Sequence, residues 1–355
     1  MTSAYVGTLY KKVSYQSLGI ANTSFITDPF MKVLVAYKGL AEKIKEILPE
    51  DIEVVYPKTG TNKELIKLAK DVEIIVSTRL SSVVVENAPR LRLLQKTGAG
   101  VDDMPFEALK PDTYIANTSG SNPLPLAEGA VALVLALAKR IVPRHRDFHE
   151  KPIDKRGVMF HGKTAGILGM GSIGVEVAKM LKALGIDVIA IRRGRDEKLR
   201  SELGLKWLGD KDNLDRLMRG SDFLVVTIPL TPETRGLIGE HEIKQMKKGS
   251  YIVNVARAAI IQEKPLYEAL KTGHLAGAAC DVWWQPHFWD PLWNVEGNPA
   301  SAYPFWELDN VICTPHNIVS TDEQTDASLD IMVENIIRIR DGKEPINQVD
   351  KQLRY

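Results

Sequence analysis

The segment TAGILGMGSIG, residues 164–174, decides the fold of the second half of the chain. A short apolar strand over 164–168 leads directly into three glycines with the spacing Gly-x-Gly-x-x-Gly, and a helical pattern over 172–184 follows. Such glycines permit a tight turn, a close approach of the backbone to a pyrophosphate, and close packing of helix on sheet. The helix N-terminus offers unpaired N–H groups to that anion. We therefore assign to a dinucleotide cofactor Gly169, Gly171, Ser172, Ile173 and Gly174; the alternative is a purely structural glycine turn.

The following strand, residues 187–191, favours one dinucleotide over the other. It ends in Arg192-Arg193-Gly194-Arg195, where sites for NAD usually carry an acidic residue that binds the ribose 2′-hydroxyl. Guanidinium groups bind phosphate through paired donors. Arg192 and Arg193 therefore indicate a preference for NADP(H) over NAD(H). The alternative is a solvated basic turn, because Asp196 and Glu197 follow immediately.

Strands and helices alternate on both sides of this motif. We expect strands at 32–37, 52–56, 73–77, 93–97 and 114–117 in the first half, and at 164–168, 187–191, 223–228, 251–255, 275–281 and 311–314 in the second. Helical spacing occupies 42–48, 62–70, 124–141 and 325–340. This alternation is typical of parallel sheets with right-handed crossovers.

The predicted fold class is therefore α/β with two domains, as a chain of 355 residues also suggests. Six strands match a complete Rossmann dinucleotide-binding domain, which we place at 123–317. A smaller flavodoxin-like α/β substrate domain would span 31–122 and 318–355, because the terminal helix has to pack somewhere. Residues 1–30 have weak periodicity and form an N-terminal extension.

The composition excludes several classes of function. Net charge is +1, from 46 basic and 45 acidic residues, so neither a nucleic-acid nor a membrane surface is indicated. No secretory signal and no run of about 18 apolar residues without polar breaks is present. Two cysteines, Cys280 and Cys313, are expected to be buried, reduced thiols. These features predict a cytoplasmic protein, and no metal site is predicted.

Three further motifs follow predicted strands, at the sheet edge where open α/β sheets bind ligands. They are NVAR (254–257), DVWWQP (281–286) and TPH (314–316). With the glycine motif, they resemble the D-isomer-specific 2-hydroxyacid dehydrogenase family, which includes glyoxylate/hydroxypyruvate reductases, phosphoglycerate dehydrogenase and NAD-dependent formate dehydrogenase. Stretches at 97–102, 122–128 and 229–234 also match, so the resemblance covers about 31–349.

This resemblance implies roles that agree with the chemistry of the residues. Arg257 would clamp the substrate carboxylate and polarise the carbonyl group, as a permanently charged planar donor can. His316 would donate a proton to the carbonyl oxygen as hydride arrives, because imidazole titrates near neutrality. The alternatives are a surface salt bridge for Arg257 and a backbone-bonded histidine at a strand end.

The other implied contacts divide between substrate and cofactor. The backbone N–H groups of Gly98, Ala99, Gly100 and Val101 would bind the substrate carboxylate, and Asn122 would line the substrate cleft. Asp281 would contact the nicotinamide amide. The remaining cofactor contacts implied by the resemblance are Ile228, Pro229, Thr234, Val255 and Ala256.

Gln285 departs from the family pattern, which has a glutamate just before the proline at this place. A neutral amide orients an imidazole but cannot stabilise imidazolium by charge, so we predict a lowered pKa for His316. Formate dehydrogenases of the family also pair His with Gln, since removing hydride from formate needs no proton shuttle. Formate is therefore the alternative substrate to glyoxylate, hydroxypyruvate or a similar small 2-oxo acid.

Three further expectations concern partners and loops. The long apolar helix 124–141 predicts a homodimer interface. The aromatic segment 287–306 predicts either a lid over the cleft or packing against the domain surface. A different class of function, a non-catalytic NADP(H)-sensing protein such as a corepressor, uses the same fold. Arg257 and His316 argue against it, because a sensor needs neither.

Overall fold

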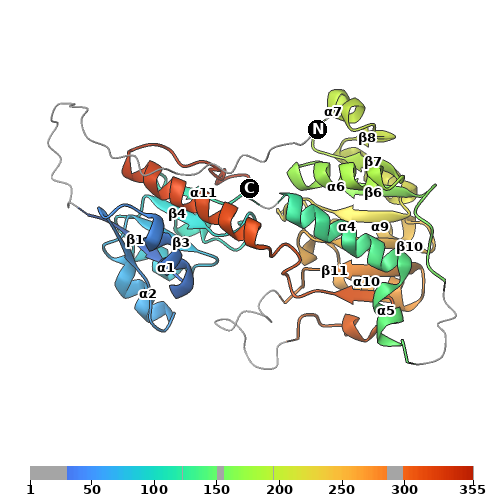
Figure 1. Ribbon diagram of the computed structural model, residues 1–355, viewed down its shortest axis with the longest axis horizontal. Coiled ribbons are helices and arrows are strands. Elements are labelled where there is room, and N and C mark those ends of the chain that lie inside the picture. Colours follow the sequence, from blue (N-terminus) through green and yellow to red (C-terminus); the bar gives the residue numbers. More distant parts are fainter. Residues whose placement is uncertain (1–29, 122, 150–155, 195, 286–298, 355) are drawn as a thin grey trace, which may run out of the picture.

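The computed structural model describes residues 30–121, 123–149, 156–194, 196–285 and 299–354. They form two α/β lobes that lie side by side, joined at the start of α4 and just before α11 (Figure 1). The strands are β1 (Met31–Val35), β2 (Ile52–Val55), β3 (Ile74–Ser77), β4 (Leu93–Lys96), β5 (Tyr114–Ala116), β6 (Thr164–Leu168), β7 (Asp187–Ile191), β8 (Trp207–Gly209), β9 (Phe223–Val226), β10 (Ser250–Asn254), β11 (Leu275–Cys280) and β12 (Val311–Cys313).

The first lobe is a parallel five-stranded sheet in the order β2-β1-β3-β4-β5, which is the flavodoxin-like order. Its helices are α1 (Lys38–Ile47), α2 (Asn62–Ala69), α3 (Ser82–Glu86) and α11 (Asp322–Arg340). Two apolar clusters cover the sheet, one on each face. The predicted small α/β unit is therefore confirmed in its sheet order.

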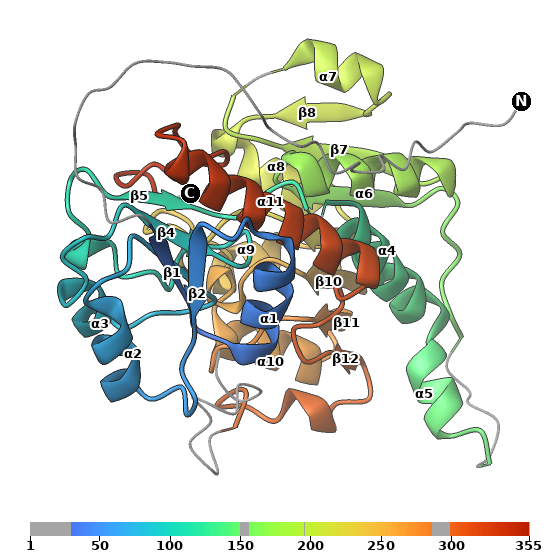
Figure 2. The same cartoon turned by 60° about the vertical axis from the view of Figure 1, so that its left-hand side comes forward.

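Helix α11 carries the chain back to the first lobe, as expected for a terminal helix that has to pack somewhere. Its buried side chains recur every three or four residues and join the core of the first sheet; they are Leu329, Met332, Val333, Ile336 and Ile339. Buried Asn335 donates to Gln95 on β4 (2.8 Å) and accepts from the Ile346 N–H (2.7 Å). Figure 2 shows α11 lying across the sheet beside α1.

The second lobe is a parallel seven-stranded sheet in the order β12-β11-β10-β9-β6-β7-β8. Its helices are α4 (Pro123–Lys139), α5 (Ile141–Arg146), α6 (Ser172–Ala183), α7 (Glu197–Glu202), α8 (Leu214–Gly220), α9 (Glu240–Gln245) and α10 (Glu263–Lys271). Apolar clusters again cover both faces. The Rossmann architecture is confirmed, and β6 is the strand that precedes the glycine turn.

Two expectations about the second lobe are wrong. The sheet has a seventh strand, β8, which the sequence does not reveal because it is three residues long and pairs only with β7. Cys280 is buried, but its neighbour in register, Cys313, is exposed because β12 is the edge strand. Among the described residues, none of the helices has the length and apolar character of a membrane span.

Candidate active site

The glycine turn after β6 has the geometry that a bound pyrophosphate requires. Gly169 has a φ of 107°, in the region that favours glycine, and a Cβ on Gly174 would lie 2.0 Å from the Gly169 carbonyl oxygen. A Cβ on Gly171 would instead meet open space. Helix α6 begins at Ser172, and its first turn carries no acidic residue and accepts no side-chain cap. Its N–H groups therefore suit an anion such as the cofactor pyrophosphate.

The other predicted cofactor residues lie on loops around the glycine turn. A Cβ on Gly169 would lie 2.6 Å from Ile228 Cγ2, so Ile228 covers the turn. The Thr234 hydroxyl donates to the Pro229 carbonyl (2.7 Å) and shapes the loop that follows β9. Val255 is buried after β10. The Ala256 N–H donates to Asn254 Oδ1 (3.1 Å). The residues thus gather at the carboxyl edge of the second sheet.

Arg192 and Arg193 follow β7 at the same edge. The guanidinium of Arg192 lies 2.5 Å from Asp196, which also accepts from the Leu199 N–H at the start of α7. Arg193 is exposed. The carboxylate of Asp196 thus lies close to the C-terminal end of β7. It pairs with Arg192 and accepts a backbone N–H at the start of α7. A ribose 2′-phosphate would have to share Arg192 with Asp196.

Arg257 connects the two lobes. It follows β10, where buried Asn254 donates to the Arg257 carbonyl (3.0 Å), and its Nη1 donates to the Ala256 carbonyl (2.9 Å). Its Nε donates to Asp102 of the first lobe (2.8 Å). A Cβ on Gly100 would lie 1.6 Å from Arg257 Nη2, so only glycine leaves room for the guanidinium there. The predicted segment Gly98–Val101 and the predicted arginine therefore meet.

His316 is held in the left-handed region (φ 57°), two residues after the Thr314 that follows β12. The carboxylate of Asp281 holds this turn: it accepts from the Thr314 hydroxyl (2.7 Å) and from the N–H groups of Asn317 (3.2 Å) and Ile318 (3.3 Å). Buried Trp283 donates its indole N–H to the Thr314 carbonyl (2.9 Å). Asp281 thus anchors the His316 turn, and the predicted contact with nicotinamide stays a prediction.

Burial, followed by the nearby Arg257 guanidinium, lowers the pKa of His316 to about 4. The carboxylates of Asp102 and Asp103 oppose this effect, and the ammonium of Lys96 adds to it. The direction agrees with the expectation based on Gln285, although the main causes are different. Gln285 itself is exposed, and its backbone N–H donates to the Ala300 carbonyl (2.9 Å). Its action on His316 stays a prediction.

An ionic group that the sequence reasoning missed lies beside Arg257. The Lys96 side chain, only 5% exposed at the end of β4, lies 2.7 Å from Asp103, and Arg79 after β3 lies 3.2 Å from the same carboxylate. Burial lowers the pKa of Lys96, and Asp103 opposes that effect. The sequence signal that could have revealed this group is a lysine at the end of an apolar strand. A lysine is rarely buried unless it is paired, so its position indicates a buried ion pair.

Three predictions fall partly or wholly outside the described residues. Asn122 lies outside them, as do the N-terminal extension up to residue 29 and residues 287–298 of the aromatic segment. In the described part of that segment, Tyr303 and Phe305 pack against Tyr267 of α10, with ring centroids 5.1 and 5.4 Å apart. Within the described ranges, no three His, Cys, Asp or Glu side chains are grouped as metal ligands.

Comparisons with known proteins show the family of the chain. Residues 131–317 match the D-isomer specific 2-hydroxyacid dehydrogenase family, NAD binding domain. A glyoxylate reductase of Korarchaeum cryptofilum is 32% identical, over 82% of this chain and 87% of its own. A D-3-phosphoglycerate dehydrogenase of Methanocaldococcus jannaschii is 33% identical over 90% of this chain, which spans only 59% of that relative's length.

A solved structure from Xanthobacter autotrophicus Py2, a D-isomer specific 2-hydroxyacid dehydrogenase in complex with NADPH and MES, is also similar. It is 27% identical, has a TM-score of 0.72, and aligns over 92% of this chain and 100% of its own. The chain therefore belongs to the D-isomer-specific 2-hydroxyacid dehydrogenase family.

Proposed function

We propose that this chain is an NADP(H)-dependent reductase of a small 2-oxo acid such as glyoxylate or hydroxypyruvate, giving the D-2-hydroxy acid. The observation that carries the proposal is the meeting of Arg257 with Asp102 and Gly100 at the edges of two parallel sheets, with His316 near enough for the charge of Arg257 to lower its pKa. In this proposal residues 31–122 and 318–355 form the substrate domain, and residues 123–317 form the cofactor domain.

The substrate carboxylate would bind between Arg257 and the backbone N–H groups of Gly98–Val101. Asp102 accepts a hydrogen bond from Nε of Arg257, and the Ala256 carbonyl accepts one from Nη1. The remaining N–H groups of the guanidinium would bind the substrate carboxylate. Because Asp102 and the Ala256 carbonyl fix two edges of the guanidinium, its orientation is set before substrate arrives.

When bound, the cofactor supplies a hydride to the carbonyl carbon. His316 donates the matching proton to the carbonyl oxygen, so that one C–H and one O–H bond form as the C=O double bond becomes single. The substrate carboxylate also places a negative charge beside Arg257. Because Arg257 is the second cause of the lowered His316 pKa, substrate binding raises that pKa and favours the protonated donor.

The alternative substrate is formate, and the residue that favours it is Gln285. Formate oxidation transfers hydride from carbon and leaves carbon dioxide without an O–H proton to remove, so a neutral amide beside the histidine is sufficient. The non-catalytic sensor is the alternative of another class. Both alternatives are distinguished by the same assay.

The assay follows the absorbance of NADPH and NADH with glyoxylate, hydroxypyruvate and pyruvate, and of NADP⁺ and NAD⁺ with formate. We expect 2-oxo acid reduction, and Arg257→Gln should lower kcat/KM by about 10²-fold or more, because a charged carbonyl-polarising donor is lost. Arg200→Gln is the control, since Arg200 pairs with exposed Glu197 on α7. Oxidation of formate alone would support the first alternative, and no turnover at all would support the sensor.

A second prediction concerns the pH dependence. His316 should titrate near pH 4 in the free protein, as measured by NMR of its imidazole, and Gln285→Glu should raise that pKa by adding a negative charge. Reduction needs the protonated imidazole, so its rate is highest below the pKa in the substrate complex and falls as pH rises through it. The falling limb should move to higher pH in Gln285→Glu. Superimposable profiles would refute a role for position 285.

A third prediction concerns the cofactor. Arg192→Ser with Arg193→Ser should lower kcat/KM for NADPH by about tenfold or more and leave that for NADH within about twofold, because the lost guanidinium groups would bind the 2′-phosphate, which NADH lacks. Lys198→Ser, on the exposed face of α7 beside Glu202, controls for the loss of positive charge near the site. Equal losses with the two cofactors would show that the arginines do not read the phosphate.

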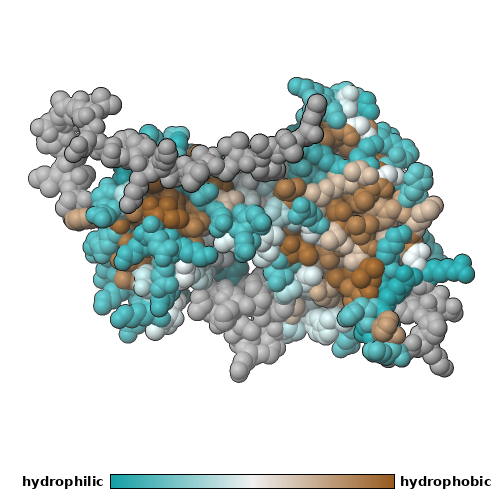
Figure 3. Space-filling view, in the orientation of Figure 1, coloured by the Kyte–Doolittle hydropathy of each residue, from teal (hydrophilic) through white to brown (hydrophobic). Residues whose placement is uncertain are grey.

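A fourth prediction concerns assembly. We propose a homodimer through helix α4 and the residues that follow it, where Leu124, Ile141 and Val142 are between 44% and 54% exposed. Figure 3 shows an apolar surface over this part of the second lobe. Light scattering of the wild type should give twice the mass of the chain. The variant Ile141→Asp should give the mass of a monomer, whereas the control Val83→Asp on α3 should keep the mass of the dimer. A monomeric wild type would contradict the proposal.

A further inference from the structure

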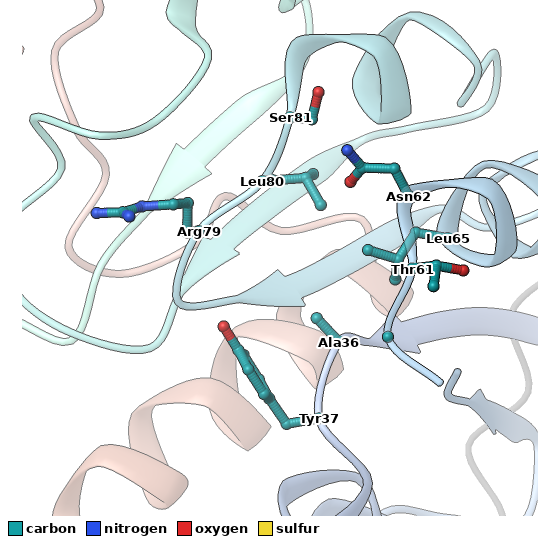
Figure 4. A pocket seen from close by; sticks show the side chains of 9 residues that line it. Ala36, Tyr37, Thr61, Asn62, Leu65, Arg79, Leu80 and Ser81 are labelled. Carbon is teal, nitrogen blue, oxygen red and sulfur yellow. The ribbon is translucent and has the colours of Figure 1, made fainter. Parts of the chain in front are cut away.

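A cavity of about 290 Å³ opens at the carboxyl edge of the first sheet. It lies between the ends of β1 and β3, where the sheet order reverses and where open α/β sheets bind their ligands. Its volume is close to the smallest that ligand sites usually have, so it suits a small molecule. Three segments line it, and Figure 4 shows their side chains: Ala36 and Tyr37; Gly60, Thr61, Asn62 and Leu65; Arg79, Leu80 and Ser81.

This cavity is next to the segment proposed to bind the substrate carboxylate. The hydroxyl groups of Thr78 and Thr97 are 2.8 Å apart, so the loop after β3 is joined to the loop after β4. Arg79, which lines the cavity, is bonded to Asp103, two residues beyond Val101. The loop that lines the cavity is thus hydrogen-bonded to the loop on which the substrate carboxylate would lie.

The lining combines apolar and neutral polar side chains. Ala36, Leu65 and Leu80 provide aliphatic surface, and all three are buried. The hydroxyl of Tyr37 and the amide of Asn62 approach from opposite sides of the cavity in Figure 4. Such a lining matches a short aliphatic chain that ends in a hydrogen-bonding group, since a few placed polar groups give ligand sites their specificity.

The charged side chains around the cavity already have partners, which argues against a second carboxylate on the substrate. The guanidinium of Arg79 is paired with Asp103. The first turn of α2 already carries the carboxylate of Glu64, which accepts from the N–H groups of Lys58 (2.7 Å) and Thr59 (2.8 Å). These bonds, with the Thr59 hydroxyl as the largest cause, lower the pKa of Glu64 to about 2. A second substrate carboxylate would therefore lie near the negative charge of Glu64 and would have no cation to pair with.

We infer that this cavity is the chamber for the substrate side chain, and that it selects 2-oxo acids whose side chain ends in a neutral hydrogen-bonding group, such as a carboxamide. The inference rests on the proposed function, because it assigns a substrate class to that same site.

Three substrates of nearly equal shape test the chemistry of the chamber. They are 2-oxoglutaramate with a terminal carboxamide, 2-oxoglutarate with a carboxylate, and 5-methyl-2-oxohexanoate with an isopropyl group. We expect kcat/KM for the carboxamide to exceed that for each of the others by about tenfold, the value of one well-placed hydrogen bond or one uncompensated charge. Equal values for all three acids, or the highest value for either of the other two, would overturn the selection.

A matched pair of variants tests the place. Ser81→Trp puts a large side chain into the cavity, whereas Ser82→Trp adds it at the next residue, which is exposed and outside the lining. The ratio of kcat/KM for 2-oxoglutaramate to that for glyoxylate should fall at least tenfold in Ser81→Trp and stay unchanged in Ser82→Trp. An unchanged ratio in both variants refutes the chamber but leaves the proposed function intact. A wild type that reduces none of these acids refutes both.

Discussion

The ion pair between Arg257 and Asp102 is the contact on which the arrangement of the site depends. Both sheets are parallel, so each gathers the carboxyl ends of its strands at one edge, and this pair joins the two edges at 2.8 Å. Gly100 leaves the space that the guanidinium fills. The pair is about one quarter exposed, so its contribution to the free energy of folding is modest. Its main effect is to position the guanidinium. It fixes where a carboxylate from outside can bind.

The elements with a strong local signal could be predicted from the sequence. Strands β6 and β7 begin and end at the predicted residues, because each is an apolar run bounded by a turn. The glycine turn was equally clear, since its spacing has a physical reason at each position. The return of α11 was expected only because a lone terminal helix has to pack somewhere, and the structure shows the apolar stripe that packs. Strand β8 was missed because three residues show no periodicity, and Cys313 was misjudged because edge position is a property of the whole sheet.

Only part of the site could be predicted from the sequence, for a related reason. Arg257 and His316 stand at strand ends in recognisable motifs, but their electrostatic neighbours come from the other lobe. Asp102, Asp103 and Lys96 act on His316 across a gap of more than two hundred residues, and no spacing rule reaches that far. The bonds of Asp281 were not visible for the same reason: its carboxylate accepts from backbone N–H groups of the His316 turn, and no motif indicates such a contact.

The closing of the first sheet by α11 also has a consequence for the order in which the protein can be made. The ribosome delivers the N-terminal end first. Strands β1–β5 therefore leave it more than two hundred residues ahead of the helix that covers one of their faces. The second sheet, by contrast, is contiguous and complete before α11 exists. The nascent chain thus carries an uncovered apolar face throughout the synthesis of its cofactor-binding half, and that half is the first to be able to finish folding.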